Sequence, residues 1–515
     1  MRAFFFTILA VFLLSACSWS ERDLDAGPDS DGVDGGDTDI SDGDDGGAGD
    51  QVSDQGGDEA GGDEGPRLLR RAVVLGDGGF YGTSGIRVGA VNGHAGGSYV
   101  IGAHYADIST DPENPIQAGK IYLYNNGSVP ASFDDAVLEL QPPDGAVAGF
   151  GYSLSGSCDI NNDGFLDLPV GDHLYSPPGA SYSGRVVVFW GDSSGTLSMD
   201  RYSYHRLSDS MRRSSDSMGQ TIVCADFDGD GYDDLLSTGQ NAGLDDTGIG
   251  AIYYGGEAGL PEFPDAIIAP EVAASHQYFG SATVYEDLDG DGDRDLAVGA
   301  WELIKGTQTT DPHTGGVAVF SGGSDWTSGP SYNLFPSSDQ VTHMGMDLAY
   351  ADAGDRQFLA VGVPDYPAEY NGSVFVYQVG MADWQLQDPV AVLRPPGGVA
   401  HTGFPSDMAY IPDFYGRDQG AMLIGMRYGD ASPTQTGVGI VAVFPRTADG
   451  ASFELLADMI LVAPDPVSND SFGIAVVPLD DVDGDGLRDF LVGMSQHLEG
   501  TIEEGTQTGG VVFFY

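Results

Sequence analysis

An internal repeat constrains the fold of this chain more than any other feature of its sequence. After Pro66, three landmarks return in the same order about every 65 residues. The first landmark is a glycine, and its seven copies are Gly82, Gly151, Gly219, Gly280, Gly345, Gly403 and Gly473. The second is an apolar strand that ends near a Gly, as in LAVGA (296–300), and the third is a glycine that opens an apolar run, as in GIVAVF (439–444). A repeat of this length has room for about four short strands, which indicates a propeller blade, and seven blades close a ring.

Four of the repeats share an acidic frame of nine residues directly before the second landmark. The frames are DINNDGFLD (159–167), DFDGDGYDD (226–234), DLDGDGDRD (287–295) and DVDGDGLRD (481–489). Positions 1, 3, 5 and 9 carry Asp or Asn, position 6 is Gly, and position 7 can offer its backbone carbonyl. This pattern suits Ca²⁺, a hard cation that prefers several oxygen ligands. Without a cation, the crowded carboxylates would repel one another.

We predict one Ca²⁺ in each frame, about four ions in all, with a solvated acidic turn as the alternative. An EF-hand does not fit, because it would need Glu at position 12 and a helix after the loop. Catalytic acids are disfavoured, because they need different environments whereas the frames repeat with little change. The predicted ligands are Asp159, Asn161, Asp163, Phe165, Asp167, Asp226, Asp228, Asp230, Tyr232, Asp234, Asp287, Asp289, Asp291, Asp293, Asp295, Asp481, Asp483, Asp485, Leu487 and Asp489.

The combined landmarks resemble the FG-GAP repeat of the integrin α-subunit β-propeller. The best copies pair Phe279-Gly280 with Val298-Gly299-Ala300, and Phe472-Gly473 with Val492-Gly493. The resemblance covers residues 67–515 and weakens in the fifth and sixth repeats, whose loops ADAGDRQ and PDFYGRD lack regular acidic spacing. It implies an all-β, seven-bladed propeller with calcium hairpins between the first and second strands of a blade.

The ends of the chain predict how such a ring closes. The last repeat stops at Tyr515 directly after its third strand, so its outer strand is missing. The segment 71–84 is similar to the lead-in of other outer strands. We therefore expect Ala72 to Leu75 to pair with the strand that ends at Tyr515, which would cover an exposed sheet edge.

The resemblance also implies a ligand face opposite the calcium hairpins, formed by the loops between second and third strands. Aromatic, imidazole and basic side chains gather there, and such groups are typical of binding sites. The alternative is that they only pack the loops together. The candidate ligand-binding residues are His104, Tyr105, His173, Trp301, Tyr366, Arg427, Tyr428 and His497.

We expect a binding or adhesion module for a protein or carbohydrate ligand rather than an enzyme. A polysaccharide lyase is the catalytic alternative, because Tyr, His and Arg could supply its base and its uronate contact. An assembly scaffold of the cell envelope is a third possibility. The sequence contains no P-loop and no H-E-x-x-H motif.

Charge limits the partners of this chain. It has 78 acidic and 20 basic residues, for a formal net charge of -58. Nucleic acid and anionic lipid would be repelled, because both are bound through Lys and Arg. Any contact with a membrane is therefore expected through an anchor alone.

The N-terminus predicts such an anchor. Residues 1–16 have one basic residue, an apolar run and small residues, as in a secretory signal peptide. LSAC (14–17) resembles the bacterial lipobox, which implies lipidation of Cys17 and an outer-membrane lipoprotein of the cell envelope, facing the periplasm or the exterior. Residues 17–66 are rich in Asp and Gly and are expected to form a disordered stalk before the propeller at 67–515. Of the remaining cysteines, Cys158 and Cys224, the simplest interpretation is two separate buried side chains, and their pairing stays open.

Overall fold

The structure is a computed structural model, and it describes residues 69–515 except 77, 92–96, 110–114, 147–148, 157, 273, 307–311, 339–340, 342, 365–371, 397–402, 417–418, 433, 497, 500–505 and 508. The chain divides into two compact units, Met1–Gly62 and Asp63–Tyr515. The predicted signal peptide, Cys17 and the stalk lie outside the described residues. In the described part, no helix combines the length and the apolar character that a membrane span requires.

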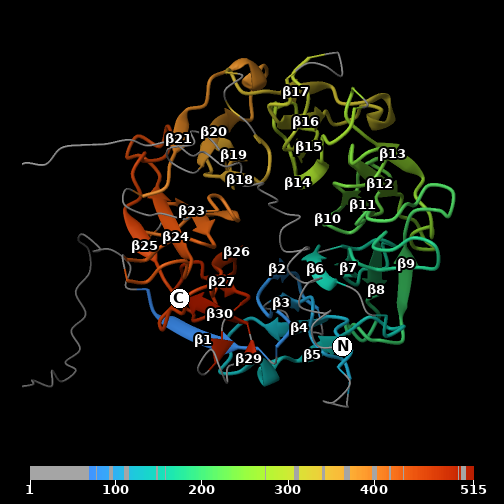
Figure 1. Ribbon diagram of the computed structural model, residues 1–515, viewed down its shortest axis with the longest axis horizontal. Helices are drawn as coiled ribbons and strands as arrows, with labels where there is room; N and C mark the ends of the chain where they lie inside the picture. Colours follow the sequence, from blue (N-terminus) through green and yellow to red (C-terminus); the bar gives the residue numbers. More distant parts are fainter. Residues whose placement is uncertain are drawn as a thin grey trace, which may run out of the picture. The chain divides into compact units, whose positions relative to one another are not determined.

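The second unit is a seven-bladed β-propeller, as predicted, and each blade is a four-stranded antiparallel sheet (Figure 1). Blades 1 to 3 contain β2 (Ser84–Val88), β3 (Ser98–Ala103), β4 (Lys120–Asn125), β5 (Leu138–Leu140), β6 (Phe150–Leu154), β7 (Leu168–Asp172), β8 (Arg185–Phe189), β9 (Tyr202–His205), β10 (Thr221–Ala225), β11 (Asp234–Gly239), β12 (Ile249–Tyr253) and β13 (Ala266–Ile268). Blades 4 to 6 contain β14 (Phe279–Glu286), β15 (Asp295–Ala300), β16 (Gly316–Phe320), β17 (Tyr332–Leu334), β18 (Leu348–Asp352), β19 (Gln357–Val363), β20 (Ser373–Val379), β21 (Ala391–Leu393), β22 (Met408–Ile411), β23 (Ala421–Met426), β24 (Ile440–Pro445) and β25 (Met459–Leu461). In Figure 1 the labelled first strands, β2, β6, β10, β14, β18 and β26, lie nearest the centre of the ring within their blades.

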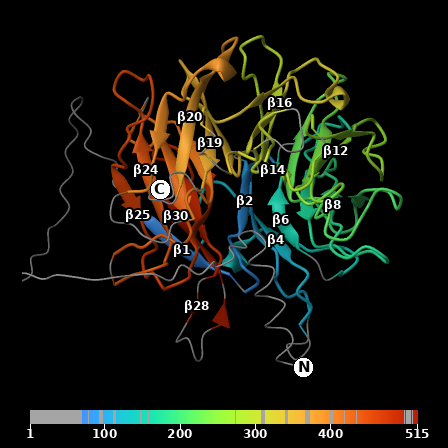
Figure 2. The ribbon, with the colours of Figure 1, turned by 45° about the horizontal axis from the view of Figure 1, so that its top comes forward.

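Blade 7 joins the two ends of the described chain and confirms the predicted closure. It contains β26 (Phe472–Pro478), β27 (Phe490–Met494), β30 (Gly510–Phe514) and β1 (Arg71–Leu75). In the antiparallel pair of β1 and β30, Ala72 lies opposite Phe513 and Leu75 opposite Gly510. Figure 2 shows β1 alongside the C-terminal strands. The other described elements are the strand pair β28 (Leu498–Glu499) and β29 (Thr506–Gln507), and three short 3-10 turns, η1 (Phe133–Asp135), η2 (Trp326–Ser328) and η3 (Trp384–Leu386).

The hydrophobic core lies between neighbouring blades. Every residue of β15 and β16 is buried, because a neighbouring blade covers each face of these strands. Such strands read as continuous apolar runs rather than as an alternating pattern. Phe150 of blade 2, for example, packs with Val100 and Ile121 of blade 1.

The landmark residues of the repeat lie at contacts between neighbouring blades. Gly439, the third landmark of blade 6, forms a parallel bridge with Phe472, which begins blade 7. A Cβ atom at Gly439 would lie 2.2 Å from the carbonyl oxygen of Phe472, so a side chain has no room there. In blade 6 the predicted first landmark, Gly403, is wrong: Phe404 is the buried aromatic residue, and Pro405 follows it where other blades have Gly.

Candidate metal centres and ligand face

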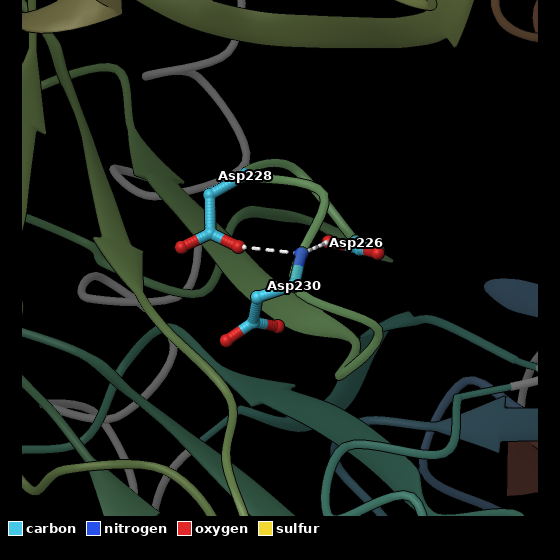
Figure 3. A group of neighbouring side chains, drawn as sticks. All are labelled: Asp226, Asp228 and Asp230. Atoms are coloured by element: carbon cyan, nitrogen blue, oxygen red, sulfur yellow. Dashed lines mark hydrogen bonds between the residues drawn. The ribbon is translucent and has the colours of Figure 1, made fainter.

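The acidic frames form the hairpins between the first and second strands of blades 2, 3, 4 and 7. In three of these hairpins, three carboxylates offer ligand atoms that all lie within 4.8 Å of one another. The three groups are Asp226, Asp228 and Asp230, shown in Figure 3, then Asp287, Asp289 and Asp291, and finally Asp481, Asp483 and Asp489. We call these groups the acidic clusters.

The backbone of each hairpin aims the carboxylates at one point. In blade 3, the Gly231 N–H donates to Asp226 Oδ2 at 2.9 Å. The Asp230 N–H donates to Asp228 Oδ1 at 3.2 Å, as Figure 3 shows. Gly231 has φ 91°, a left-handed conformation that glycine adopts without strain. The Gly292 N–H donates in the same way to Asp287 Oδ2 in blade 4, at 3.0 Å.

The ninth residue of each frame is buried and ties the hairpin to its blade. Asp234 accepts hydrogen bonds from the N–H groups of Phe227, at 2.7 Å, and Gly255, at 2.8 Å. Burial raises the pKa of Asp234 to about 7, although these hydrogen bonds oppose the shift. Burial likewise raises the pKa of Asp167 to about 7 and that of Asp295 to about 6. A cation beside these carboxylates would favour their ionised form.

The frame of blade 2 differs from the other three, because Asn161 stands at its third position. Its amide donates to Asp163 Oδ2 at 3.1 Å, and the Asp163 N–H donates to Asp159 Oδ1 at 3.0 Å. The seventh residue, Phe165, donates its N–H to Asp163 Oδ1 at 2.9 Å, as its counterparts do in the other frames. Each predicted ligand therefore lies on its hairpin, and the all-oxygen donor sets of the acidic clusters could hold a hard divalent cation.

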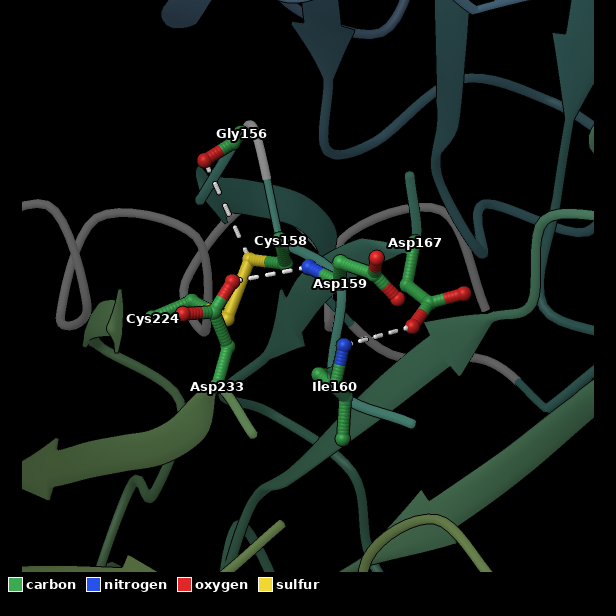
Figure 4. The surroundings of a disulfide bond; sticks show 7 residues. All are labelled: Gly156, Cys158, Asp159, Ile160, Asp167, Cys224 and Asp233. Carbon is green, nitrogen blue, oxygen red and sulfur yellow. Dashed lines mark hydrogen bonds between the residues drawn. A yellow bond between two sulfur atoms is a disulfide. The ribbon is translucent and has the colours of Figure 1, made fainter. Parts of the chain in front are cut away.

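A disulfide bond links the first two frames. Cys158 and Cys224 are joined, with their Cα atoms 5.9 Å apart (Figure 4). Beside the bond, the Asp159 N–H donates to Asp233 Oδ2 at 2.8 Å. The interpretation as two separate side chains is wrong. Their separation of 66 residues is close to one repeat, and this places the two cysteines on adjacent blades.

On the face opposite the acidic hairpins, where the sequence predicts a ligand and which we call the ligand face, blades 1 and 2 form an aromatic cluster of Phe80, His104, Tyr105, Tyr152 and His173. The ring of His104 lies 4.4 Å from that of Tyr105, and the ring of Tyr152 lies 4.0 Å from that of His173. Phe80 stacks on His104 at 5.5 Å. Burial lowers the pKa of His104 to about 3 and that of His173 to about 4, so both imidazoles are neutral at neutral pH.

Trp301 lies in a second group on this face. Its ring stacks on Tyr278 at 4.1 Å with an interplanar angle of 4°, and His343 meets its edge at 5.2 Å. The indole N–H donates to Gln240 Oε1 at 3.3 Å. Because Tyr278 covers one side of the indole, only the other side is available for stacking with a ligand.

Blade 6 places Arg427 and Tyr428 directly after β23. The guanidinium carbon of Arg427 lies 5.0 Å from the centre of the Tyr428 ring. The predicted candidates Tyr366 and His497 lie outside the described residues.

Sequence reasoning missed four residues of this face: Phe80, Tyr152, Tyr278 and His343. Three of them stand two positions before a first landmark and have left-handed φ values of 61°, 52° and 60°, which are uncommon for bulky residues. Ser217 shares this conformation in blade 3, so the turn belongs to the repeat and only its side chain varies. The start of each first strand and the end of each second strand lie at the same face of the ring. The residues around the first landmark glycine could therefore have indicated this face from the sequence.

Comparison with known proteins agrees with this architecture. Residues 159–237 match the family model of the FG-GAP-like repeat. The chain is similar to phosphatidylinositol-glycan-specific phospholipase D of Bos taurus, at 27% identity over 230 residues that cover 42% of this chain and 26% of the relative. It is also similar to integrin alpha-4 of Xenopus laevis, at 28% identity over 190 residues that cover 36% of this chain and 17% of the relative.

These matches are partial. They span about a quarter of the phospholipase and less of the integrin chain. Among solved structures, the crystal structure of BBS1N in complex with ARL6DN, soaked with mercury, matches 69% of this chain and 90% of its own chain, with a TM-score of 0.35 and 11% identity. A TM-score at this level adds nothing to the description of the fold.

Proposed function

We propose that this propeller of FG-GAP repeats, similar to those of integrin α chains, is a calcium-binding module that recognises a protein or a glycan outside the cytoplasm. The observation that carries the proposal is that different kinds of side chain occupy the two ends of the blades. Acidic clusters occupy the hairpins at one end, and aromatic, imidazole and basic side chains occupy the other.

In this proposal each of the four frames holds one Ca²⁺, with the carboxylates and amide at positions 1, 3, 5 and 9 and the carbonyl at position 7 as ligands. The chemistry that the ion supplies is charge compensation. The residues themselves hold the hairpin in one conformation, and the buried ninth Asp connects that hairpin to the second strand. Calcium then stabilises the native state by mass action, because it binds the folded hairpins and not the unfolded chain.

The ligand binds to the face opposite the acidic hairpins, where Trp301, Tyr428 and the aromatic cluster form the contact surface. Partly exposed aromatic rings with polar groups beside them are typical of binding sites. Lipidation of Cys17 would hold the module at the bacterial cell envelope, as an outer-membrane lipoprotein, and the acidic stalk would lift it from the membrane.

The low pKa values of His104 and His173 favour binding over the lyase alternative. An efficient general base has a pKa near the working pH. Burial instead lowers the pKa of these imidazoles to about 3 and about 4, so at neutral pH they are weak bases.

A capture experiment tests the proposal. The chain from Ser18 onward, immobilised in Ca²⁺, should retain an envelope or host component, and the double variant Trp301→Ala/Arg427→Ala should not retain it. Arg356→Ala is the matched control, because Arg356 donates to Gln378 on another face of the ring, in the hairpin that has lost its acidic frame. Equal capture by the wild type and the double variant would contradict the proposed ligand face.

A further inference from the structure

Glu302 contacts two histidines on the ligand face, one position after Trp301. Its Oε2 lies 3.8 Å from His313 Nδ1, and its Oε1 lies 3.5 Å from His343 Nε2. Each imidazole therefore lies beside a different oxygen of the same carboxylate. The Glu302 N–H donates to the carbonyl of Gln277 at 3.3 Å, which fixes the backbone from which this carboxylate projects. We call Glu302, His313 and His343 the Glu–His group.

Backbone contacts also hold the two histidines in place. His313 forms an antiparallel bridge with Ile304, within the connection between β15 and β16 of blade 4. The Met344 N–H donates to the carbonyl of Thr314 at 3.3 Å. Because each of these last two residues directly follows one of the histidines, this bond places both imidazoles on neighbouring stretches of backbone. The group thus joins blade 4 to the segment that enters blade 5.

The spacing within the group suits ligands of one ion better than hydrogen-bond partners. Both distances are longer than the roughly 2.7–3.2 Å of an N–H···O hydrogen bond. Two ligand atoms at about 2.0–2.1 Å from one tetrahedral Zn²⁺ lie roughly 3.3 Å apart.

The group is more open than the acidic clusters, whose ligand atoms all lie within 4.8 Å of one another. Its imidazoles must therefore turn toward an ion that the carboxylate holds. The side chain of His313 is 35% exposed and that of His343 is 26% exposed, so both rings have room to turn.

The donor set selects the kind of ion. Two imidazole nitrogens and one carboxylate oxygen suit a first-row transition-metal dication such as Zn²⁺, whereas Ca²⁺ takes oxygen ligands. A formal net charge of -58 attracts cations to the protein. The ring of His343 also meets the edge of Trp301 at 5.2 Å, so an ion bound here would lie close to the proposed contact surface.

We propose that Glu302, His313 and His343 bind one Zn²⁺ on the ligand face. This site is distinct from the acidic hairpins at the opposite end of the blades. It goes beyond the proposed function, because it requires no macromolecular ligand. Three protein ligands leave the fourth position of a tetrahedral ion to water. The ion would fasten the connection in blade 4 to the start of blade 5.

Calorimetric titration of the chain from Ser18 onward with Zn²⁺, in saturating Ca²⁺, tests this site. Glu302→Gln, His313→Gln and His343→Asn should each weaken one Zn²⁺ site of the wild type tenfold or more, because each removes a ligand. Asn is chosen at position 343 because it tolerates the left-handed φ of 60° better than most residues. Circular dichroism confirms that each variant is folded.

The matched control is His276→Gln, which should leave Zn²⁺ binding unchanged. His276 Nε2 also lies 3.8 Å from a carboxylate oxygen, Asp246 Oδ2. Within the described residues, however, no second histidine forms an ion pair with Asp246. Co²⁺ gives a second readout, since the wild type should show the visible absorption of a cobalt ion with few ligands, and the three ligand variants should lose it.

Two results would overturn the inference. Equal Zn²⁺ affinity of the wild type and the three ligand variants would assign the ion to acidic residues elsewhere, and a folded wild type that binds no Zn²⁺ would leave the group as ion pairs alone. The capture experiment is made in Ca²⁺ and fails separately. Capture by a protein that binds no Zn²⁺ contradicts only the zinc site, and Zn²⁺ binding without capture contradicts only the proposed function.

Discussion

A buried ion pair beside the ligand face gives the sharpest test of the packing in blade 2. The side chain of Arg185 is only 1% exposed, and its Nε donates to Asp172 Oδ2 at 2.8 Å. Its other nitrogens donate to both oxygens of Asp144, at 2.6 and 2.9 Å. The guanidinium lies between the rings of Tyr175, at 3.7 Å, and Tyr204, at 4.4 Å. Asp172 ends β7, directly before His173, so this pair positions part of the aromatic cluster.

We expect Arg185→Met to lower the free energy of unfolding by about 3–5 kcal/mol at pH 7.5, because removing one partner leaves a buried charge uncompensated. The loss has an upper limit, since Asp172 can take up a proton instead. At pH 7.5 this costs a carboxyl with an ordinary pKa about 5 kcal/mol, and at pH 5 only about 1.5 kcal/mol. Burial already raises the pKa of Asp172 to about 6, against the opposing effect of Arg185. Without Arg185 this pKa rises further, so the loss shrinks as the pH falls.

Urea unfolding followed by tryptophan fluorescence, in saturating Ca²⁺ at pH 7.5 and pH 5, measures this loss. The matched control is Arg201→Met, which breaks the partly exposed pair with Asp192 at 2.9 Å and should cost far less, because solvent screens an exposed ion pair. The reasoning is refuted if Arg185→Met and Arg201→Met cost the same, or if the loss for Arg185→Met grows as the pH falls.

Three further perturbations follow from the structure. Burial raises the pKa of Asp347 well above its ordinary value, with the charge of Asp407 adding to the shift, and raises the pKa of Asp407 to about 7. Raised pKa values favour the protonated forms in the folded protein, so stability is lost as the pH rises through about 7. Asp347→Asn should therefore raise the urea midpoint at pH 8 more than at pH 5.5. Deletion of residues 67–76 should lower the melting temperature of the whole ring, because β30 loses its partner β1, and an unchanged melting temperature would contradict the closure. Ca²⁺ added after EDTA should stabilise the protein by about 2.7 kcal/mol per site at a hundredfold excess over Kd, and superimposable urea curves with and without Ca²⁺ would rule out calcium binding.

The ring and its closure could be predicted because both follow from counting. Seven copies of the landmarks define seven blades, and the missing outer strand of the last repeat requires a strand from elsewhere in the chain. The segment from Ala72 to Leu75 was the available candidate, and it pairs with β30 in the expected direction. The acidic frames were equally accessible, since their ligand spacing is local and does not depend on tertiary contacts.

The arrangement of the ligand face could not be predicted to the same depth, because it depends on side chains from different blades. The stacking of Trp301 on Tyr278 joins residues 23 positions apart in the sequence, and no local sequence pattern predicts this contact. The contact of Tyr152 in blade 2 with His104 in blade 1, whose ring centroids lie 5.5 Å apart, likewise depends on the position of each blade in the ring. In blade 6 the glycine of the first landmark, Gly403, comes one residue before the buried ring of Phe404, whereas in the other blades the glycine follows the buried residue.

The two ends of one strand show how the acidic clusters and the ligand face are related. Asp295 begins β15, and Trp301 follows its last residue, Ala300. Six residues of extended strand span about 20 Å, so a cation at the hairpin cannot touch a ligand at the opposite face. Calcium can influence recognition only by holding the blade in place. This separation explains why the frames repeat with little change while the residues two positions after the second-landmark glycines of the same blades differ, as His173, Asn241, Trp301 and Ser495 do. Under the proposed function, specificity therefore resides in the varied end of each blade, and the repeated end supplies stability.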